Sequence, residues 1–421
     1  MSAMTTEPAI TRPRIRELRL RRFRAFENAR LILNDFTVIV GRNGSGKTTL
    51  MEAFAFLQDA VTHSLLTALE RRGGLNSILH RPSNPAKRRE APANREGSAG
   101  PRHSKVVEIA IQLQLPVTNV LYGFTLGLSS GRAGFVVKRE VLKTFPKTSF
   151  SFDREDRDFS SLIKGAKPNV GRESLVLPVI AEHEEVWKMT LDALSQLLVY
   201  DLSPQMMQAE PRIGSQQALA RDGANIGDVL RRLDSDKDDM GWIIRHMEVV
   251  TRGITDIRAK ASAGRRIINF FQQTGDKKSR FVGSEMSNGT LHSLGVLVAL
   301  RQKPIPSLVF VDEIEASIHT AALSALMDAA SVSSEERCQV IMSTHSTDAL
   351  SHPSVTPSNV RVVDWQNDRS LIFHVGKEVR EQLRPPETVG RLLRSNALWP
   401  EDNPTTVGEH IFEVREDDSE A

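Results

Sequence analysis

The stretch FTVIVGRNGSGKTTLMEAF, residues 36–54, constrains the fold of this 421-residue chain more than any other segment. It begins with a β-branched apolar run typical of a buried strand and continues through a loop rich in glycine. It ends in helix-forming residues that place Leu50 and Leu57 on one face. Residues Gly41–Thr48 fit the pattern G-x-x-x-x-G-K-[ST] completely, in the strand–loop–helix context that the pattern requires. The segment therefore predicts a loop that binds phosphate groups.

The residue types in this loop match the chemistry of holding a phosphate. Glycines permit backbone angles closed to other residues and bring amide N–H groups close to phosphate oxygens. Lys47 is expected to reach the β- and γ-phosphates, and the Thr48 hydroxyl is expected to bind Mg²⁺. The alternative is a glycine turn with a chance lysine, which the flanking strand and helix disfavour. The expected nucleotide-binding residues are Gly41, Arg42, Asn43, Gly44, Ser45, Gly46, Lys47, Thr48 and Thr49.

Composition limits the classes of protein that remain. The chain is 40% hydrophobic, which is enough for a large core or two lobes, and its net charge of +3 does not describe a basic nucleic-acid coat. A single cysteine, Cys338, excludes a disulfide framework and favours the reducing cytosol, so the expected localisation is cytoplasmic. The N-terminus lacks a signal-peptide core, and no stretch approaches the roughly 20 apolar residues that span a bilayer, so no membrane partner is expected.

The chain divides into four expected regions. Residues 13–178 form an N-terminal lobe with the phosphate loop and an antiparallel sheet, and within it the basic, Pro- and Gly-rich segment 81–105 is expected to be a mobile loop. A helical insert is expected at 179–262, a C-terminal lobe at 263–376 and a tail at 377–421. Because SLVFV and CQVIM are continuous apolar strands, the fold class is predicted as α/β, with a mixed central sheet flanked by helices on both faces.

Three later features supply groups for chemistry on a phosphate. LVFVDE ends a buried strand with Asp312, expected to hold Mg²⁺, and Glu313, expected to polarise an attacking water. SEMSNGT places Ser287 and Gly289 at the start of a helix, where N–H groups favour phosphate. The third feature is STHS, which contains His345. Taken singly, each feature also has a structural alternative. The acids could mark where a strand meets solvent, Ser287 could be an ordinary N-cap, and His345 could be a structural histidine.

The order and spacing of these motifs resemble the ABC-type ATPases, a class of P-loop NTPases, and within them the soluble branch of SMC, RecF and OLD-like proteins. GRNGSGKT resembles the Walker A motif, MSNGT the signature motif and LVFVDE the Walker B motif. IEASIH is similar to the D-loop region, STHS to the switch histidine, and LRLRRFRAF to the first strand and turn of this branch.

The resemblance implies ATP and Mg²⁺ as cofactors and assigns roles to residues. Glu313, Lys47 and His345 are the implied catalytic residues, Ser287 and Gly289 complete the nucleotide site, and Thr48 with Asp312 holds the metal. The sequence departs from the family in lacking a long coiled coil. A Q-loop glutamine is not assigned, because Gln112 and Gln114 lie on an expected strand.

Family members bind two ATP molecules between two heads, so the resemblance implies a homodimer or higher homo-oligomer loosened by hydrolysis. Its first implied function is a defence ATPase that controls a separate effector protein, a nuclease, against phage. The alternative is a DNA-repair or chromosome-maintenance ATPase that binds DNA, with the 81–105 segment and the N-terminal arginines as contacts, although a solvated linker is preferred for that segment. Two alternatives remain. One is a scaffold in which ATP only holds a dimer together, which Glu313 disfavours. The other is a transporter cassette, which the MSNGT and RRFRAF sequences disfavour.

Overall fold

The computed structural model describes residues 12–81, 105–129, 134–156, 158–161, 168–209, 214, 216–376, 388–394, 403–408 and 410–414. The segment expected to be a mobile loop, 81–105, lies almost entirely outside these ranges, as does much of the 377–421 tail. Among the described residues, no helix combines the length and the apolar character needed to cross a bilayer.

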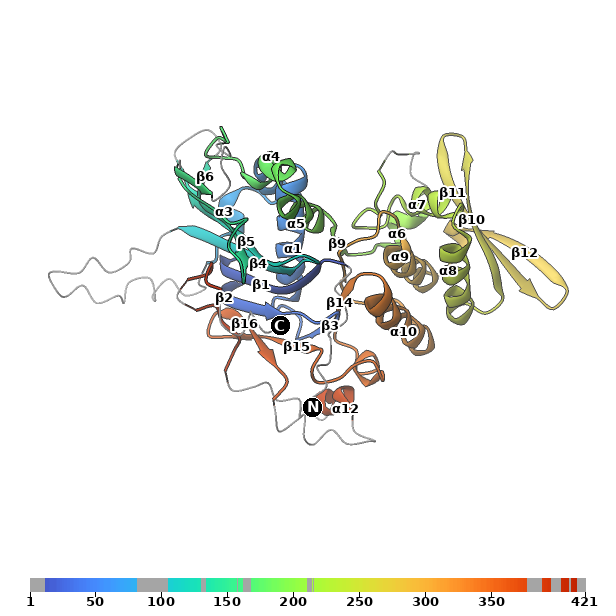
Figure 1. Ribbon diagram of the computed structural model, residues 1–421. Coiled ribbons are helices and arrows are strands. Elements are labelled where there is room, and N and C mark those ends of the chain that lie inside the picture. The colour runs from blue at the N-terminus through green and yellow to red at the C-terminus, as the bar shows by residue number, and fades with distance from the viewer. Residues whose placement is uncertain are drawn as a thin grey trace, which may run out of the picture.

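A six-stranded sheet forms the centre of the molecule, in the order β16-β15-β3-β14-β13-β9 (Figure 1). The strands β15, β3, β14, β13 and β9 run parallel, and β16 closes one edge antiparallel to β15. The strands β3 and β13 are buried at every position because layers cover both faces of the sheet. Their bounds are β3 Phe36–Val40, β9 Leu197–Tyr200, β13 Leu308–Val311, β14 Gln339–Thr344, β15 Val360–Gln366 and β16 Arg369–His374.

One face of the central sheet packs on helix α1 and, beyond it, on a seven-stranded antiparallel sheet (Figure 1). Aromatic rings join these layers: Phe54 of α1 meets Phe310 of β13 edge-on, with ring centroids 6.1 Å apart. The helices are α1 Lys47–Thr62, α2 Leu65–Glu70, α3 Leu75–Ile78, α4 Leu177–Ile180 and α5 Glu185–Ser195. The strands are β1 Arg14–Phe23, β2 Phe26–Ile32, β4 Val106–Gln114, β5 Asn119–Leu128, β6 Phe135–Phe145, β7 Phe152–Glu155 and β8 Asp158–Ser161.

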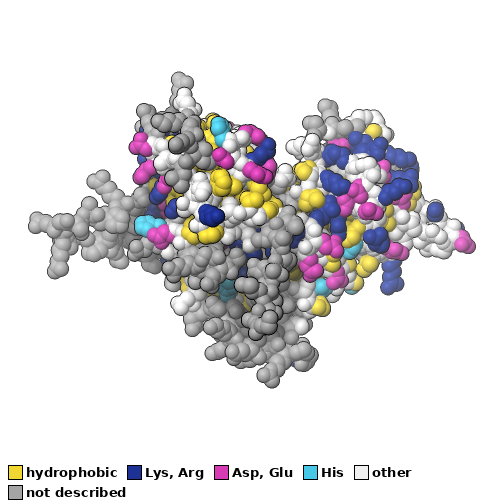
Figure 2. Space-filling view, in the orientation of Figure 1, with side chains coloured by type: hydrophobic (Ala, Val, Ile, Leu, Met, Phe, Trp, Pro, Cys, Tyr) yellow, Lys and Arg dark blue, Asp and Glu magenta, His cyan; other side chains and the backbone are white. Residues whose placement is uncertain are grey.

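The opposite face packs on a second group of helices, which also carries a three-stranded antiparallel sheet. The helix α9 is buried around nearly its whole circumference, because it lies between the central sheet and the neighbouring helices. Figure 2 shows Lys and Arg side chains gathered over this lobe. Its elements are α6 Pro204–Gln208, α7 Ile226–Leu233, α8 Lys237–Val250, β10 Ile254–Ser262, β11 Arg265–Thr274, β12 Lys277–Val282, α9 Asn288–Arg301 and α10 Thr320–Glu336.

These layers confirm the predicted fold class, but the 179–262 range differs from the expected helical insert. Strand β9 lies inside this range and pairs in parallel with β13, with Leu197 opposite Leu308, so it belongs to the central sheet. The range also contains the whole of β10. The reason for the difference is that LLVY is a short apolar run between helices, and a run of four residues carries too little periodicity to separate a buried strand from a buried helix.

The described parts of the tail return to the body of the protein. Helix α12, Val389–Arg394, packs on the short 3₁₀ turn Ala349–Ser351. Further on, the Thr405 N–H donates to the Ile372 carbonyl at 2.7 Å. Residues Ile411 and Phe412 pack on the outer face of the seven-stranded sheet. The tail therefore contributes to the core of the described structure.

Candidate functional site

The loop between β3 and α1 has the backbone that its glycines allow. Gly44 and Gly46 lie in the left-handed region, with φ of 78° and 114°. At Gly41, a Cβ atom would lie 2.2 Å from the Val363 carbonyl oxygen, so only glycine fits against this neighbouring strand. A side chain at Gly46 would meet Ser370 Oγ at 2.5 Å. The conformation is therefore one that these three glycines specify.

The polar groups of the loop fit a phosphate. Lys47 is buried, with 6% of its surface exposed, and its Nζ donates to the carbonyls of Gly41 at 2.7 Å and Arg42 at 3.2 Å. The buried Ser45 hydroxyl has no hydrogen-bond partner among the described residues. A buried cation beside an unsatisfied donor and the N-terminus of a 16-residue helix is a suitable environment for an anion.

Thr48 and Asp312 meet at the start of α1, although 264 positions separate them in the sequence. Thr48 Oγ1 donates to Asp312 Oδ2 at 3.3 Å, and Asp312 Oδ1 accepts a hydrogen bond from the Ser343 hydroxyl. A hydroxyl and a carboxylate are the hard oxygen ligands that Mg²⁺ takes alongside phosphates and waters. The described residues hold no group of three or more His, Cys, Asp or Glu that could bind a metal ion by themselves.

Glu313 follows Asp312 with an exposed side chain and a φ of 47°. Positive φ is rare and costly for a residue with a long side chain, and it persists where the surroundings enforce it. Here the Ser343 hydroxyl accepts from the Glu313 N–H at 2.9 Å, while the Ser343 carbonyl accepts from the Ile314 N–H at 3.2 Å. Strand β14 thus fixes the turn that carries both acids.

His345 follows β14 and is oriented by Glu315. One carboxylate oxygen of Glu315 lies 3.0 Å from His345 Nδ1 and accepts from the His345 N–H at 2.8 Å. The other accepts from the Thr344 hydroxyl at 2.8 Å. The Glu315 side chain is 13% exposed, whereas that of His345 is 50% exposed. The carboxylate therefore holds an imidazole that remains accessible at the carboxyl edge of the sheet.

Ser287 is the N-cap of α9, as the sequence predicts: its Oγ accepts from the Thr290 N–H at 3.1 Å. A Cβ at Gly289 would lie 2.3 Å from the Ser317 carbonyl oxygen, so the turn packs tightly on the segment after the two acids. Figure 1 shows α9 and α1 on opposite sides of the central sheet. The contacts of the phosphate loop with described residues include none from Ser287 or Gly289, and their role at a nucleotide stays a prediction.

Three residues near this edge were not singled out for a role by sequence reasoning. Ser343 lies within STHS and Glu315 within IEASIH, so motif position could have marked them, but their partners became visible only in the fold. Asp201 follows β9 and is exposed. The carbonyl of Tyr200, the last residue of β9, accepts from the Asp312 N–H at 2.9 Å, so β9 ends beside Asp312. Because both strands end at the same edge, Asp201 adds a further carboxylate there.

The glutamines weighed for the Q-loop have structural surroundings. Gln112 and Gln114 lie in β4 of the seven-stranded sheet. Gln114 Oε1 accepts from Arg16 Nε at 2.8 Å. Gln112 Oε1 accepts from Arg19 Nη2 at 3.5 Å, so both glutamines contact arginines of β1.

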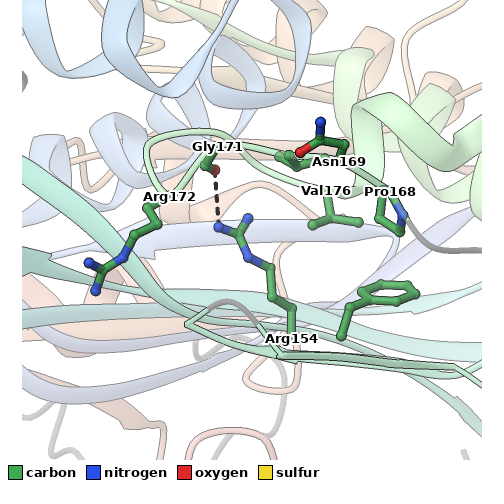
Figure 3. Close-up of a pocket in the computed structure, with 8 residues that line it drawn as sticks. Arg154, Pro168, Asn169, Gly171, Arg172 and Val176 are labelled. Atoms are coloured by element: carbon green, nitrogen blue, oxygen red, sulfur yellow. Dashed lines mark hydrogen bonds between the residues drawn. The ribbon is translucent and has the colours of Figure 1, made fainter.

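A cavity of about 350 Å³ lies in the N-terminal lobe, away from the phosphate loop (Figure 3). Arg154 reaches into it and is 3% exposed. Its guanidinium donates to the carbonyls of Asp156 at 3.0 Å, Ser174 at 2.7 Å and Gly171 at 3.0 Å. The arginine therefore holds a loop in place, and this cavity is not the candidate site.

Comparison with known proteins gives one family and a set of distant structures. A family model described as "AAA domain, putative AbiEii toxin, Type IV TA system" matches residues 36–351. No curated protein matches the chain.

The similar solved structures include heads of SMC proteins. An SMC head bound to the C-winged helix domain of ScpA is 15% identical over 87% of this chain and 99% of that one, with a TM-score of 0.49. An SMC head with an extended coiled coil, bound to the C-terminal domain of ScpA from Pyrococcus furiosus, is 13% identical over 88% and 98%, with a TM-score of 0.49. The SMC head from Thermotoga maritima is 13% identical over 86% and 99%, with a TM-score of 0.40. Because these sequence identities and TM-scores are low, the family of this chain is assigned from the match to the family model alone.

Proposed function

This chain belongs to the family of AAA domains described by the AbiEii-type model, and from that premise we propose that it binds and hydrolyses ATP with Mg²⁺. The observation that carries the proposal is the meeting of Thr48 Oγ1 and Asp312 Oδ2 at 3.3 Å beside a buried Lys47. This contact joins a phosphate loop to an acidic strand end in the arrangement that P-loop ATPases use.

Each residue of the site has a role in this proposal. Lys47 leaves the carbonyls of Gly41 and Arg42 to bind the β- and γ-phosphates, and Thr48 with Asp312 holds Mg²⁺. Bound Mg²⁺ supplies neutralisation of phosphate charge. Glu313 accepts a proton from the attacking water. The oxygen of that water bonds to the γ-phosphorus while the bond between the γ-phosphorus and the bridging β-phosphate oxygen breaks. His345, oriented by Glu315, donates to a γ-phosphate oxygen.

The proposal extends to a dimer of heads that controls an effector. In it, Ser287 and Gly289 of one copy meet the nucleotide held by the other, so that ATP stabilises the dimer and hydrolysis loosens it. Ser287 and Asn288 are exposed at the start of α9 and Gly289 is buried behind them, so the exposure of Ser287 is what supports this contact. The family description names a toxin and a toxin–antitoxin system, which supports a role in defence. That this role is directed against phage and acts through a separate effector, a nuclease, is the further part of the proposal and rests on the motif resemblance.

One observation favours the alternative of a DNA-handling ATPase. Residues 251–282, which contain β10–β12, carry eight Lys or Arg and two Asp, a net +6 against +3 for the whole chain. The side chains of Lys260, Lys278 and Arg280 are exposed on this sheet. Such a surface would attract a phosphate backbone, with binding that weakens steeply as salt rises. Anisotropy of labelled duplex DNA at two salt concentrations tests this alternative, and salt-independent or absent binding would remove it.

Steady-state phosphate release tests the ATPase proposal. The Lys47→Ala and Glu313→Gln variants are each expected to lose roughly 10²-fold or more in kcat, the scale of one preorganised electrostatic group. Glu335→Gln, an exposed carboxylate on α10, is the matched control and should retain full activity. Equal activity in Glu313→Gln and the unmodified protein would refute the proposed chemistry.

A further inference from the structure

The hairpin of β15 and β16 lies directly against the phosphate loop. Strand β15 pairs with β3 only as far as Val362 opposite Val40, so its next residues run beside the loop itself. A Cβ on Gly41 would lie 2.2 Å from the Val363 carbonyl oxygen, and one on Gly46 would lie 2.5 Å from Ser370 Oγ. Both strands of the hairpin thus touch the loop, one at its first glycine and one at its last.

Trp365 is placed on this hairpin by its register. It is directly opposite Ser370 in the antiparallel pair. Residues directly opposite one another project from the same face of a sheet, so Trp365 shares the face on which Ser370 contacts Gly46. The Ser370 side chain is fully buried, whereas Trp365 is 43% exposed. The indole of Trp365 is therefore carried by the residue directly opposite the one that contacts Gly46, and part of its surface is open to solvent.

Contacts with the N-terminal strands attach the hairpin that carries Trp365 to the body of the protein. The Ser370 N–H donates to the Ala25 carbonyl in the turn before β2 at 2.9 Å, and Arg369 pairs with Glu27 of β2 at 2.6 Å. On the other strand, the Trp365 N–H donates to Asp364 Oδ1 at 2.9 Å. An aromatic ring on a fixed support offers a stacking surface at small cost in conformational entropy.

From this placement we propose that Trp365 is the base-stacking residue of the nucleotide site. The triphosphate lies on the loop between Gly41 and Thr48, and the purine ring lies against the exposed part of the indole. Base–aromatic stacking accepts any planar base and needs no matched hydrogen bonds, so the residue contributes affinity more than discrimination between purines. This inference rests on the proposed function, because it assigns one more residue of the same ATP site.

Calorimetric titration with ADP and with tripolyphosphate tests the inference, because only ADP carries a base. Trp365→Ala is expected to lower ADP affinity by about 10-fold and to leave tripolyphosphate affinity unchanged, whereas Trp365→Phe keeps most of the ADP affinity. Equal ADP affinity in Trp365→Ala and the unmodified protein would overturn the assignment, as would an equal loss of tripolyphosphate binding, which would indicate a distorted loop.

Tryptophan fluorescence gives an independent readout. ADP is expected to quench the emission of the unmodified protein and of Trp242→Phe, a control in which a different partly buried indole is removed, but not that of Trp365→Phe. A quench that survives in Trp365→Phe contradicts the proposal. If the unmodified protein binds tripolyphosphate but Trp365→Ala has normal ADP affinity, only this inference fails; if the unmodified protein binds neither probe, the proposed function fails with it.

Discussion

Replacing Glu315 by glutamine tests how His345, the proposed switch histidine, is positioned. Glu315 accepts three contacts from the His345 segment: from the His345 N–H at 2.8 Å, from Nδ1 at 3.0 Å and from the Thr344 hydroxyl at 2.8 Å. Glutamine keeps the shape but offers one acceptor oxygen and a donor, so it cannot accept all three. We expect the imidazole to lose its fixed orientation while the strand β14 keeps its place in the sheet.

The structure sets the size of this effect. Hydrogen bonds to charged groups contribute about 1.5–3 kcal/mol, and solvent screening favours the low end because half of the His345 side chain is exposed, at 50%. A loss of about 1.5 kcal/mol corresponds to roughly a 10-fold fall in kcat for ATP hydrolysis. Little change is expected in KM, since Lys47 and the loop amides still bind the phosphates.

A double-mutant cycle with His345→Ala decides whether Glu315 acts through the histidine. If it does, Glu315→Gln costs about 10-fold in the unmodified background and almost nothing when His345 is already alanine. Phosphate release gives kcat for the four proteins, and thermal unfolding checks that each one is folded. The same cost in both backgrounds would refute the positioning role.

Three further predictions concern single sites. Gly46→Ala is expected to lower ADP affinity at least 10-fold, because φ is 114° and the new methyl group would lie 2.5 Å from Ser370 Oγ; Gly264→Ala, at φ 73° with open space, is the calorimetric control and should bind normally. His292 has a pKa lowered to about 4 by burial, against about 6.5 when unfolded, so stability should fall by about 2 kcal/mol from pH 7 to pH 5 as the unfolded chain takes up the proton. Urea unfolding of His292→Gln should lack that fall, and parallel pH profiles would contradict it. Burial raises the pKa of Cys338 to about 11, so iodoacetamide at pH 8 should label it only in urea, and rapid labelling of the native protein by mass spectrometry would contradict this.

The strand, loop and helix around Gly41–Thr48 and the two acids after β13 were predictable because their signals are local. A β-branched strand, a glycine loop and a helix are consecutive in the sequence, and four apolar residues before Asp312 mark a buried strand. The predicted N-cap at Ser287 follows from the same kind of short-range chemistry.

The partners of these residues could not be predicted, because they come from distant segments. The Thr48–Asp312 contact joins residues 264 apart, and the Ser343–Asp312 and Glu315–His345 contacts each depend on two adjacent parallel strands ending together. Strand β9 was missed because four apolar residues fit a helix or a strand equally well. The packing of Phe412 against the seven-stranded sheet had no signal in the tail itself.

The central claim is that two copies of this chain enclose ATP, and the mass of the Glu313→Gln protein in solution tests it most directly. Size-exclusion chromatography with light scattering would be run with ATP and Mg²⁺, with ADP and without nucleotide, and repeated with Ser287→Arg added to obstruct the contact at the start of α9. The account predicts that Glu313→Gln has twice the monomer mass with ATP and Mg²⁺, and the monomer mass with ADP or without nucleotide. It also predicts the monomer mass under all three conditions when Ser287→Arg is added. A monomer in ATP at concentrations that saturate the site, or a dimer unaffected by nucleotide and by Ser287→Arg, would contradict it.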